Sequence, residues 1–300
     1  MDQQGLFGAP PLMIVLGDEA HASLYKVLSM LGLGRRRVRH VAVDGEGRMR
    51  ADRLPPLEGP AIVCIQAGNV NSGAFDPADE IIIWARRSGA WIHVDGAFGL
   101  WALASPDHAY LAAGFREADS WATDAHKWLN VPYDSGIAIV RNREALRRAM
   151  SISGAYLPTS GHYDAMNFTP DSSRRARAVE IWAALKALGR TGLAELVSRN
   201  CRQARKIADG LRRGGVEVLN EVVLNQVVAS VGDEEQTRRV IVAIQDSGVC
   251  WCGGTTWKGV AAMRISASSW ATADSDVERS IAAILDGYRV NCHPVSSAPR

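Results

Sequence analysis

Apolar runs of strand length alternate with helix-like segments through the first 150 residues of this 300-residue chain. Ala61 to Gln66 is a continuous apolar run, as expected of a strand that is covered on both faces. Apolar residues at positions 24, 27, 28 and 31 recur with helical spacing and predict an amphipathic helix over Glu19 to Leu33. Strands that alternate with helices favour an α/β fold, with a mostly parallel sheet and helices on its faces.

The same alternation predicts the other elements of the first half. We expect strands at 38–43, 91–95 and 136–140, and helices at 77–88 and 142–150. Residues 151–173 then break the pattern with glycines and prolines, and connections of that length are usually functional lids or flexible segments. We therefore predict a large domain over residues 1–150 and a lid or connecting segment with a helix over 151–185.

The second half has a different order of elements. A helical pattern runs from 174 to 211 and is interrupted near 189–192. The pattern further predicts strands at 216–219, 226–231 and 261–267, with helices at 234–246 and 273–288. This order is typical of a compact α+β unit, so we predict a small C-terminal domain over 186–300, with the boundary near 175–190.

Composition argues against several classes of partner. The net charge of +2 is too small to indicate nucleic acid. No apolar stretch is long enough to span a bilayer and the first residues lack a signal pattern, so we expect no membrane association and a cytoplasmic location. The five cysteines are scattered, and Cys250 and Cys252 have only one residue between them, which is a poor match to a zinc site. We predict no metal.

Lys127 is the residue that most directly indicates a chemistry. It follows a histidine in an apolar and aromatic setting that includes Trp121 and Trp128, where a charged side chain is costly without a task. Upstream, Asp95 ends the apolar segment Trp91 to Val94. Pyridoxal 5'-phosphate needs such a pair, because a lysine amine forms a Schiff base with the cofactor aldehyde and a carboxylate keeps the pyridine nitrogen protonated.

Further candidate residues lie near the same predicted rim of the sheet, where ligands of open α/β folds bind. Asn69 follows the strand that ends near residue 66. Ala97 could pack its methyl group on one face of the cofactor ring, and His21 could stack on the other, although a histidine at a helix start is more often a capping or surface residue. Thr123 and His126 could donate hydrogen bonds to the cofactor phosphate or to neighbouring groups.

The remaining histidines are left out of the predicted site. His93 lies close to Asp95 in sequence, but we do not include it. His40, His108 and His293 have no partner pattern, and we expect them to be exposed.

The motifs around these residues resemble the group II pyridoxal-phosphate-dependent amino acid decarboxylases, the family of the aromatic-amino-acid and glutamate decarboxylases. The resemblance covers about Gly5 to Leu285. It rests on the strings His93-Val94-Asp95-Gly96-Ala97-Phe98-Gly99, Ala118-Asp119-Ser120-Trp121, Asp124-Ala125-His126-Lys127-Trp128-Leu129-Asn130-Val131-Pro132-Tyr133-Asp134, Glu19-Ala20-His21-Ala22-Ser23, Ser172-Ser173-Arg174-Arg175-Ala176-Arg177 and Arg264-Ile265-Ser266.

The resemblance implies an aspartate-aminotransferase-like fold, a homodimer with sites at the subunit interface, and pyridoxal 5'-phosphate as cofactor. It implies that Lys127 is the Schiff-base lysine, Asp95 the pyridinium partner and His21 the stacking residue. Family members often place a catalytic tyrosine on a mobile loop, for which Tyr163 or Tyr156 is the candidate. The other implied roles are His126 beside the phosphate, Ala97 against the ring, Asn69 where the family often has threonine, and Arg264 facing a substrate carboxylate.

The chain also departs from the family pattern, because family members carry a long region before the segment with which this chain starts. We expect the large domain to be incomplete at its N-terminus, and a second polypeptide could supply the missing part. The resemblance implies decarboxylation of an amino acid through Lys127. Two alternatives stay open: another reaction of the same cofactor, such as transamination or aldol-type cleavage, or a catalytically inactive truncated paralogue that acts as a scaffold or interaction protein.

Overall fold

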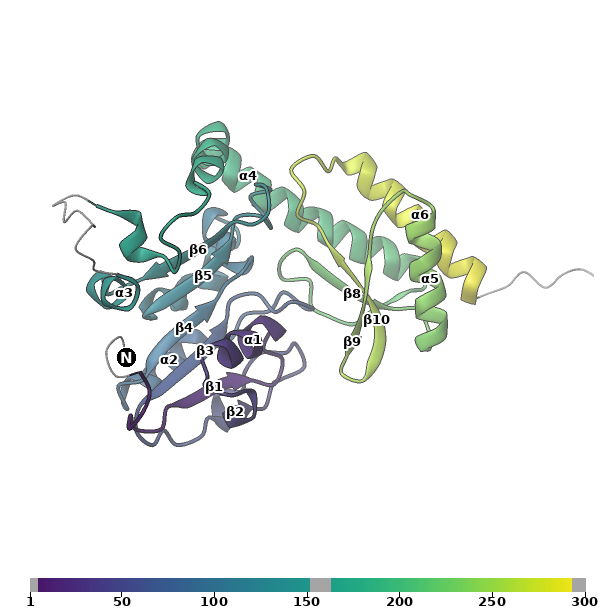
Figure 1. Cartoon of the computed structure of the whole chain (residues 1–300). Helices are drawn as coiled ribbons and strands as arrows, with labels where there is room; N and C mark the ends of the chain where they lie inside the picture. Colours follow the sequence, from purple (N-terminus) through teal and green to yellow (C-terminus); the bar gives the residue numbers. More distant parts are fainter. Residues whose placement is uncertain (1–4, 152–162, 293–300) are drawn as a thin grey trace, which may run out of the picture.

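A six-stranded sheet forms the larger of two units in the computed structural model, which describes residues 5–151 and 163–292 (Figure 1). The strand order is β2-β1-β3-β4-β5-β6, and every neighbouring pair is parallel except β5 and β6. The strands are β1 (Met13–Gly17), β2 (Val38–Val41), β3 (Ala61–Gln66), β4 (Trp91–Asp95), β5 (Ser120–Asp124) and β6 (Gly136–Val140).

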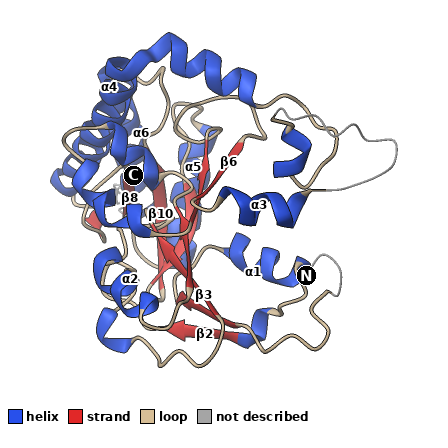
Figure 2. Ribbon diagram, turned by 90° about the vertical axis from the view of Figure 1, so that its left-hand side faces the viewer, coloured by secondary structure: helices blue, strands red, loops and turns tan. Residues whose placement is uncertain are grey.

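Both faces of this sheet carry apolar side chains, and each face packs against different helices. Along β3, Val63 and Ile65 join a core with α2 (Ala78–Arg86), whereas Ile62 and Cys64 pack towards α1 (Ala22–Met30). This is the alternation that a strand imposes on successive side chains. Figure 2 shows α1 and α2 on opposite sides of the sheet. The continuous apolar run of β3 is therefore explained by two buried faces.

Shorter helices complete the larger unit. Two 3-10 helices, η3 (Gly99–Ala104) and η4 (Ala109–Glu117), connect β4 to β5, and α3 (Arg143–Met150) follows β6 with Asn142 as its N-cap. The remaining 3-10 segments are η1 (Arg35–Arg37), η2 (Ala51–Arg53) and η5 (Ala165–Phe168).

A four-stranded antiparallel sheet forms the smaller unit, in the order β7-β8-β10-β9. Its strands are β7 (Glu217–Val218), β8 (Gln226–Ser230), β9 (Gly253–Trp257) and β10 (Val260–Ser266). Helices α5 (Glu234–Asp246) and α6 (Asp274–Cys292) cover it together with the second half of α4 (Ala178–Arg213). Asp233 and Gln236 form a capping box that begins α5.

Helix α4 runs from the larger unit to the smaller one (Figure 1). Gly189 interrupts it with a φ of 61° and a ψ of −174°, a conformation that a glycine adopts without steric cost. The predicted division into 1–150, 151–185 and 186–300 stays a prediction, since α4 crosses its second boundary.

The predicted fold class is confirmed, with a mostly parallel sheet, flanking helices and a smaller α+β unit. The predicted ranges of β3, β4, β6 and α5 match the structure, but β1, β5 and β9 were not predicted. Strand β9 reads Gly253-Gly254-Thr255-Thr256-Trp257, and its glycines have low strand propensity, so pairing with β10 rather than local preference decides its conformation.

The prediction that His108 is exposed was wrong. Its ring is buried between η3–η4 and α4, where Nδ1 lies 2.9 Å from Ser105 Oγ and Arg205 Nη2 lies 2.7 Å from Nε2. Burial lowers the pKa of His108, and the positive charge of Arg205 lowers it further. His40 is exposed, as predicted, beside Asp18 at 3.3 Å, whereas His293 lies outside the described residues.

Asp76 is a buried carboxylate that joins two segments of the larger unit. It accepts hydrogen bonds from Met49 N at 2.7 Å and from Gln66 N at 2.6 Å. Burial raises the pKa of Asp76 from 3.8 to about 6, although the two backbone donors act against this rise. The folded chain therefore binds a proton at this site more tightly than the unfolded chain does.

This pKa predicts a loss of stability as the pH rises from about 4 to about 6. The contribution of Asp76 to the free energy of unfolding is fully present below the pKa of this group in the unfolded chain. It is lost as the pH rises through the pKa in the folded chain, and it amounts to at most about 3 kcal/mol. Urea unfolding of the wild type and of Asp76→Asn at both ends of this range tests the prediction. We expect the variant to show a smaller pH dependence, and equal dependence in both proteins would contradict the assignment.

Candidate functional site

Five of the predicted site residues line one cavity of about 630 Å³ on the face of the sheet that α1 covers. They are His21, Asp95, Ala97, His126 and Lys127. Strand alternation explains how β4 and β5 contribute, because every second residue faces the same side. Trp91, His93 and Asp95 of β4, and Ser120, Ala122 and Asp124 of β5, all line the cavity. The apolar end of the cavity lies between the sheet and leucines of α1.

Lys127 enters the cavity from the turn that follows β5. Its Nζ lies 3.3 Å from Asp124 Oδ2 and 5.9 Å from the centre of the Phe98 ring, and about a third (35%) of the side chain is exposed. The next residue, Trp128, turns the other way and is buried, and its indole donates to Asn200 Oδ1 at 2.9 Å. Trp128, which belongs to the aromatic setting noted in the sequence, thus anchors the turn, while Lys127 itself reaches the cavity.

Asn130 fixes the same turn. Its backbone has a φ of 56°, which is uncommon for a residue other than glycine, and its side-chain amide donates to the carbonyls of Lys127 and Trp128 at 2.9 and 2.8 Å. A third donation, at 2.8 Å, goes to Ser268 O of the smaller unit. The position of Lys127 therefore depends on contacts with both units.

Asp95 is the last residue of β4, and its carboxylate accepts a hydrogen bond from Ala97 N at 3.3 Å. Its charge acts on two neighbours that share this side of the sheet. Burial, and to a lesser extent Asp95, raise the pKa of the Cys64 thiol to about 12. Burial lowers the pKa of His93, although Asp95 favours its protonation.

His21 has a capping role in the structure, and its stacking on a cofactor ring stays a prediction. It is the N-cap of α1, where Nδ1 accepts from Ser23 N at 3.2 Å, and its ring also lines the cavity. His126 lies against Tyr133 with ring centres 4.1 Å apart. His126 Nδ1 lies 3.1 Å from Ser135 N and 3.0 Å from Ser135 O, and Nε2 lies 3.7 Å from Asp124 Oδ2.

Three predicted site residues do not line this cavity. Thr123 alternates to the opposite side of β5, where its hydroxyl lies 3.5 Å from Ala97 O. Asn69 is buried, and its side-chain oxygen accepts from Asn71 N and Ser72 N at 2.8 and 3.2 Å, so it stabilises the loop after β3. Tyr163 is exposed and stacks on Phe168 with ring centres 5.0 Å apart. Their proposed roles stay predictions.

Two further candidates lie elsewhere. Arg264 of β10 donates to Val70 O at 2.9 Å and so joins the smaller unit to the loop that contains Asn69, and burial lowers the pKa of Arg264. Tyr156 lies outside the described residues.

Sequence reasoning missed His93, Cys64, Ser120 and Asp124, which all line the cavity. The signal was available for His93, because it stands two residues before Asp95 on one strand and must share its side. Ser120 and Asp124 required the position of β5, which was not predicted as a strand.

Two further findings concern the described residues alone. Within 5–151 and 163–292 we find no group of three or more histidine, cysteine or acidic side chains placed to hold a metal ion. No helix in this part of the chain combines the length and the apolar character needed to cross a membrane.

The family model for the pyridoxal-dependent decarboxylase conserved domain matches residues 7–231. The chain belongs to the pyridoxal-dependent decarboxylase family. It is 36% identical over 234 residues to the acidic amino acid decarboxylase GADL1 of Mus musculus, covering 73% of this chain and 42% of the relative. It is 33% identical over 234 residues to the cysteine sulfinic acid decarboxylase of Mus musculus, covering 73% of this chain and 48% of that protein. The chain thus spans less than half the length of these members of the decarboxylase family.

Solved structures confirm the expected aspartate-aminotransferase-like fold. The crystal structure of mouse CSAD matches 95% of this chain and 66% of its own, with a TM-score of 0.85 at 24% identity. The structure of Oryza sativa TDC with PLP and tryptamine matches 96% of this chain and 65% of its own, with a TM-score of 0.87 at 20% identity. This decarboxylase-family chain shares its fold with these proteins, and in this chain Lys127 and Asp95 line one cavity.

Proposed function

We propose that this chain binds pyridoxal 5'-phosphate in the cavity beneath α1 and decarboxylates an amino acid. The observation that carries the proposal is that Lys127, Asp95, His21 and Ala97, from three separate segments of sequence, line one cavity. Membership of the pyridoxal-dependent decarboxylase family supports the cofactor.

The residues present fit the cofactor ring. The cavity of about 630 Å³ is within the usual range for cofactor sites. It offers an amine at Lys127, a carboxylate at Asp95, an imidazole at His21 and a methyl group at Ala97. On this arrangement Lys127 would hold the aldehyde carbon, Asp95 the ring nitrogen, and His21 and Ala97 the two faces of the ring. His126, on the same rim as Lys127, is the described candidate for a phosphate contact.

When bound, the cofactor supplies a protonated ring that accepts the electron pair left as carbon dioxide departs. The chain's own part is to hold protons and to orient groups. Asp95 would keep the ring nitrogen protonated through a charge-assisted hydrogen bond. Asp124 Oδ2, 3.3 Å from Lys127 Nζ, holds the ammonium in place and can accept its proton, because the amine must be neutral to attack a carbonyl. His126 Nε2 lies near the same carboxylate and can relay that proton.

We propose further that the substrate is an acidic amino acid. The support is the printed activity of the relatives at 36% and 33% identity, which act on acidic amino acids and on cysteine sulfinic acid. The family resemblance makes Arg264 the candidate partner for the substrate carboxylate. It lies outside the lining of the cavity, and its donation to Val70 O leaves other guanidinium donors available.

Product analysis tests the reaction and the substrate class together. Glutamate, aspartate and cysteine sulfinate are each incubated with the chain and pyridoxal phosphate, and carbon dioxide and amine are measured. Release of both in equal amounts supports the proposal. Formation of a keto acid would overturn the proposal in favour of transamination. Absence of any product, from these substrates or from aromatic amino acids, would overturn it in favour of an inactive scaffold protein.

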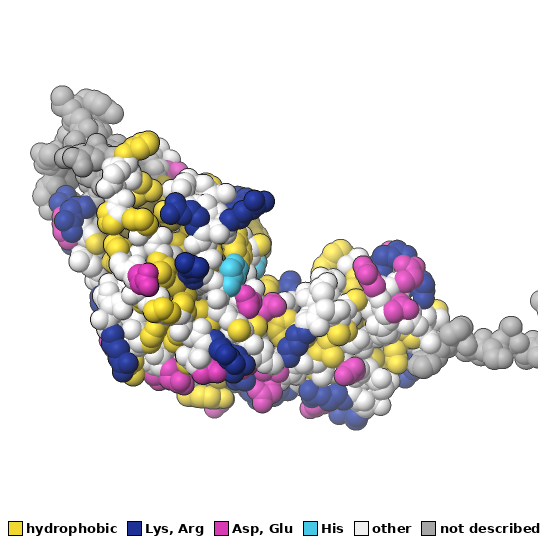
Figure 3. Space-filling model, turned by 90° about the horizontal axis from the view of Figure 1, so that it is seen from below, with side chains coloured by type: hydrophobic (Ala, Val, Ile, Leu, Met, Phe, Trp, Pro, Cys, Tyr) yellow, Lys and Arg dark blue, Asp and Glu magenta, His cyan; other side chains and the backbone are white. Residues whose placement is uncertain are grey.

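We propose that the chain assembles as a homodimer. Large hydrophobic side chains are exposed on two helices of the larger unit, namely Val27, Met30 and Leu31 of α1 and Val179, Trp182 and Leu185 of α4. Figure 3 shows hydrophobic side chains reaching the surface across one face of the larger lobe. Exposed apolar clusters of this kind mark interaction surfaces. A second polypeptide is the other occupant we propose for this surface. All five cysteines are free thiols, which supports the cytoplasmic location that we propose.

Sedimentation equilibrium tests the assembly. We expect a mass about twice the 32.4 kDa of one chain. We expect Trp182→Glu to weaken the dimer by about tenfold or more, because a charge replaces an aromatic group that the dimer would bury. Trp251→Glu, at another exposed tryptophan, which lies in the smaller unit, is the matched control and should leave the dimer intact. A wild-type chain that sediments as a monomer would contradict the homodimer and would favour a second polypeptide.

A further inference from the structure

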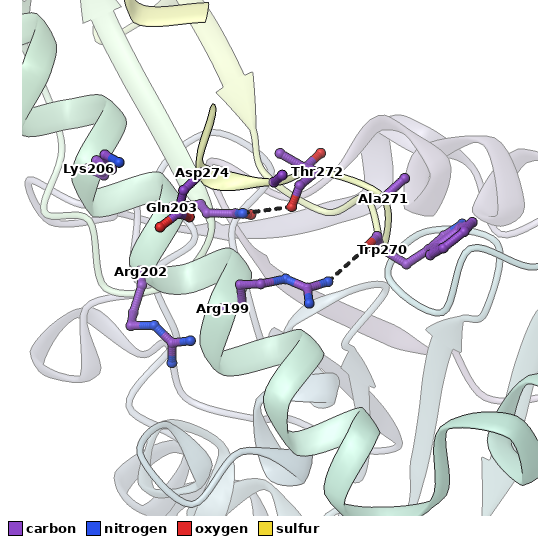
Figure 4. Close-up of a pocket in the computed structure, with 9 residues that line it drawn as sticks. Arg199, Arg202, Gln203, Lys206, Trp270, Ala271, Thr272 and Asp274 are labelled. Atoms are coloured by element: carbon purple, nitrogen blue, oxygen red, sulfur yellow. Dashed lines mark hydrogen bonds between the residues drawn. The ribbon is translucent and has the colours of Figure 1, made fainter. Parts of the chain in front are cut away.

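A second cavity, of about 480 Å³, lies between α4 and the segment that leads into α6 (Figure 4). Its helical wall carries Arg199, Arg202 and Lys206, whose spacing of three and four residues places them on one face of α4. The opposite wall is formed by residues 270–274. Of the residues that line the cavity, one, Asp274, is acidic, so basic side chains predominate.

Arg199 is the basic residue that most needs a ligand. Its Nη2 donates to Trp270 O at 2.8 Å, which holds the guanidinium at the cavity (Figure 4). Its Nε is buried and has no hydrogen-bond partner among the described residues. In the described part of the chain the guanidinium is paired only with a backbone carbonyl and not with a carboxylate. A buried donor without a partner is costly, and arginine favours oxyanions with two donors in one plane.

The other two basic residues are held only by surface ion pairs. Arg202 Nη2 lies 2.8 Å from Glu195 Oε1, and Lys206 Nζ lies 2.7 Å from Glu278 Oε1. More than half of each carboxylate side chain is exposed, and exposed pairs contribute little to stability. Both cations can therefore exchange these partners for a doubly charged ligand at small cost.

We propose that this cavity binds the phosphate group of a small molecule. Arg199, Arg202 and Lys206 supply the positive charge, and Arg199 is held at the cavity by Trp270 O with no carboxylate partner among the described residues. The exposed indole of Trp270 at the rim offers a surface on which a ring attached to the phosphate can stack. This site has no residue in common with the cavity that holds Lys127.

Isothermal titration of the chain with inorganic phosphate tests the site. Arg199→Gln should weaken phosphate binding by about tenfold or more, because a charge-assisted contact is lost. Arg212→Gln is the matched control, because Arg212 lies on the same helix and pairs only with Asp209. It should leave binding unchanged. Lys206→Gln serves as a second variant if Arg199→Gln does not fold, as judged by circular dichroism.

A further variant separates this site from the proposed cofactor site. Lys127→Gln should bind phosphate at this cavity as the wild type does, whether or not the chain is a decarboxylase. A nucleoside monophosphate that binds more tightly than phosphate, and loses that gain in Trp270→Ala, would identify a ring-bearing ligand, whereas equal affinities would identify the phosphate group alone. Absence of binding, equal binding by Arg199→Gln, or equal weakening by Arg212→Gln would overturn the proposal.

Discussion

Replacing Lys127 with alanine is expected to abolish amino acid decarboxylation, with a loss in kcat on the order of 10⁴-fold. The variant removes the only amine that lines the cavity with Asp95 and His21. It leaves the turn intact, because the turn is held by the Asn130 side chain and by the Trp128 indole. We therefore expect the folded structure to survive, which circular dichroism would show, while carbon dioxide release from the best substrate falls to background.

Lys186→Ala is the control for this experiment, since Lys186 is exposed on α4 and lies outside the cavity. It should keep wild-type activity. If Lys127→Ala were as active as Lys186→Ala with a saturating concentration of cofactor, Lys127 would have no covalent role and the assigned cavity would be wrong.

Replacing Asp95 with asparagine is expected to lower kcat on the order of 10²-fold. Asparagine has nearly the same shape, so the cavity keeps its form, but the negative charge that holds a proton on the ring nitrogen is lost. A hydrogen bond to a charged group contributes about 1.5–3 kcal/mol, and each 1.4 kcal/mol corresponds to about tenfold. The weakened electron sink adds to this loss, since an unprotonated ring stabilises the developing charge poorly.

Measurement at several cofactor concentrations separates the two effects of Asp95→Asn. Weaker binding alone would be overcome by excess cofactor, whereas a change in ring protonation persists at saturation. Asp286→Asn, at an exposed ion pair of α6, should behave as the wild type. Full activity of Asp95→Asn at saturating cofactor would show that Asp95 does not contact the ring nitrogen.

Much of the larger unit could be predicted because local pattern and tertiary structure agree there. Ala61 to Gln66 is apolar throughout, and β3 is buried on both faces between α1 and α2. In the smaller unit, the predicted helix over 234–246 likewise matches α5, which the capping box of Asp233 and Gln236 begins. Strand β1 escaped prediction although its middle is apolar, and β9 escaped because glycine and threonine give it no alternating pattern.

Members of the candidate site could be predicted where the residue type, or its distance in sequence from another candidate, was sufficient to indicate them. Lys127 and Asp95 stood out by residue type, and Ala97 followed from its distance to Asp95. Thr123 did not reach the cavity, because its side depends on the register of a strand that the sequence did not reveal. Asn69 lies close to the rim but turns its side chain into its own loop.

Contacts between the two units could not be predicted at all. The turn of Lys127 is tied to Ser268 O, and Trp128 to Asn200, across separations of 138 and 72 residues. No local pattern encodes such pairs, because each partner alone resembles an ordinary surface or core polar residue. The sequence therefore indicated the candidate lysine but not the groups that orient it.

Covalent trapping tests the central claim most directly. The purified chain is mixed with pyridoxal phosphate, reduced with borohydride, digested and mapped by mass spectrometry, with Lys127→Ala treated in parallel. The account predicts a visible absorption band before reduction and a reduced pyridoxyl group on Lys127, both absent from the variant. A modification spread over several lysines, or the same band in Lys127→Ala, would contradict it.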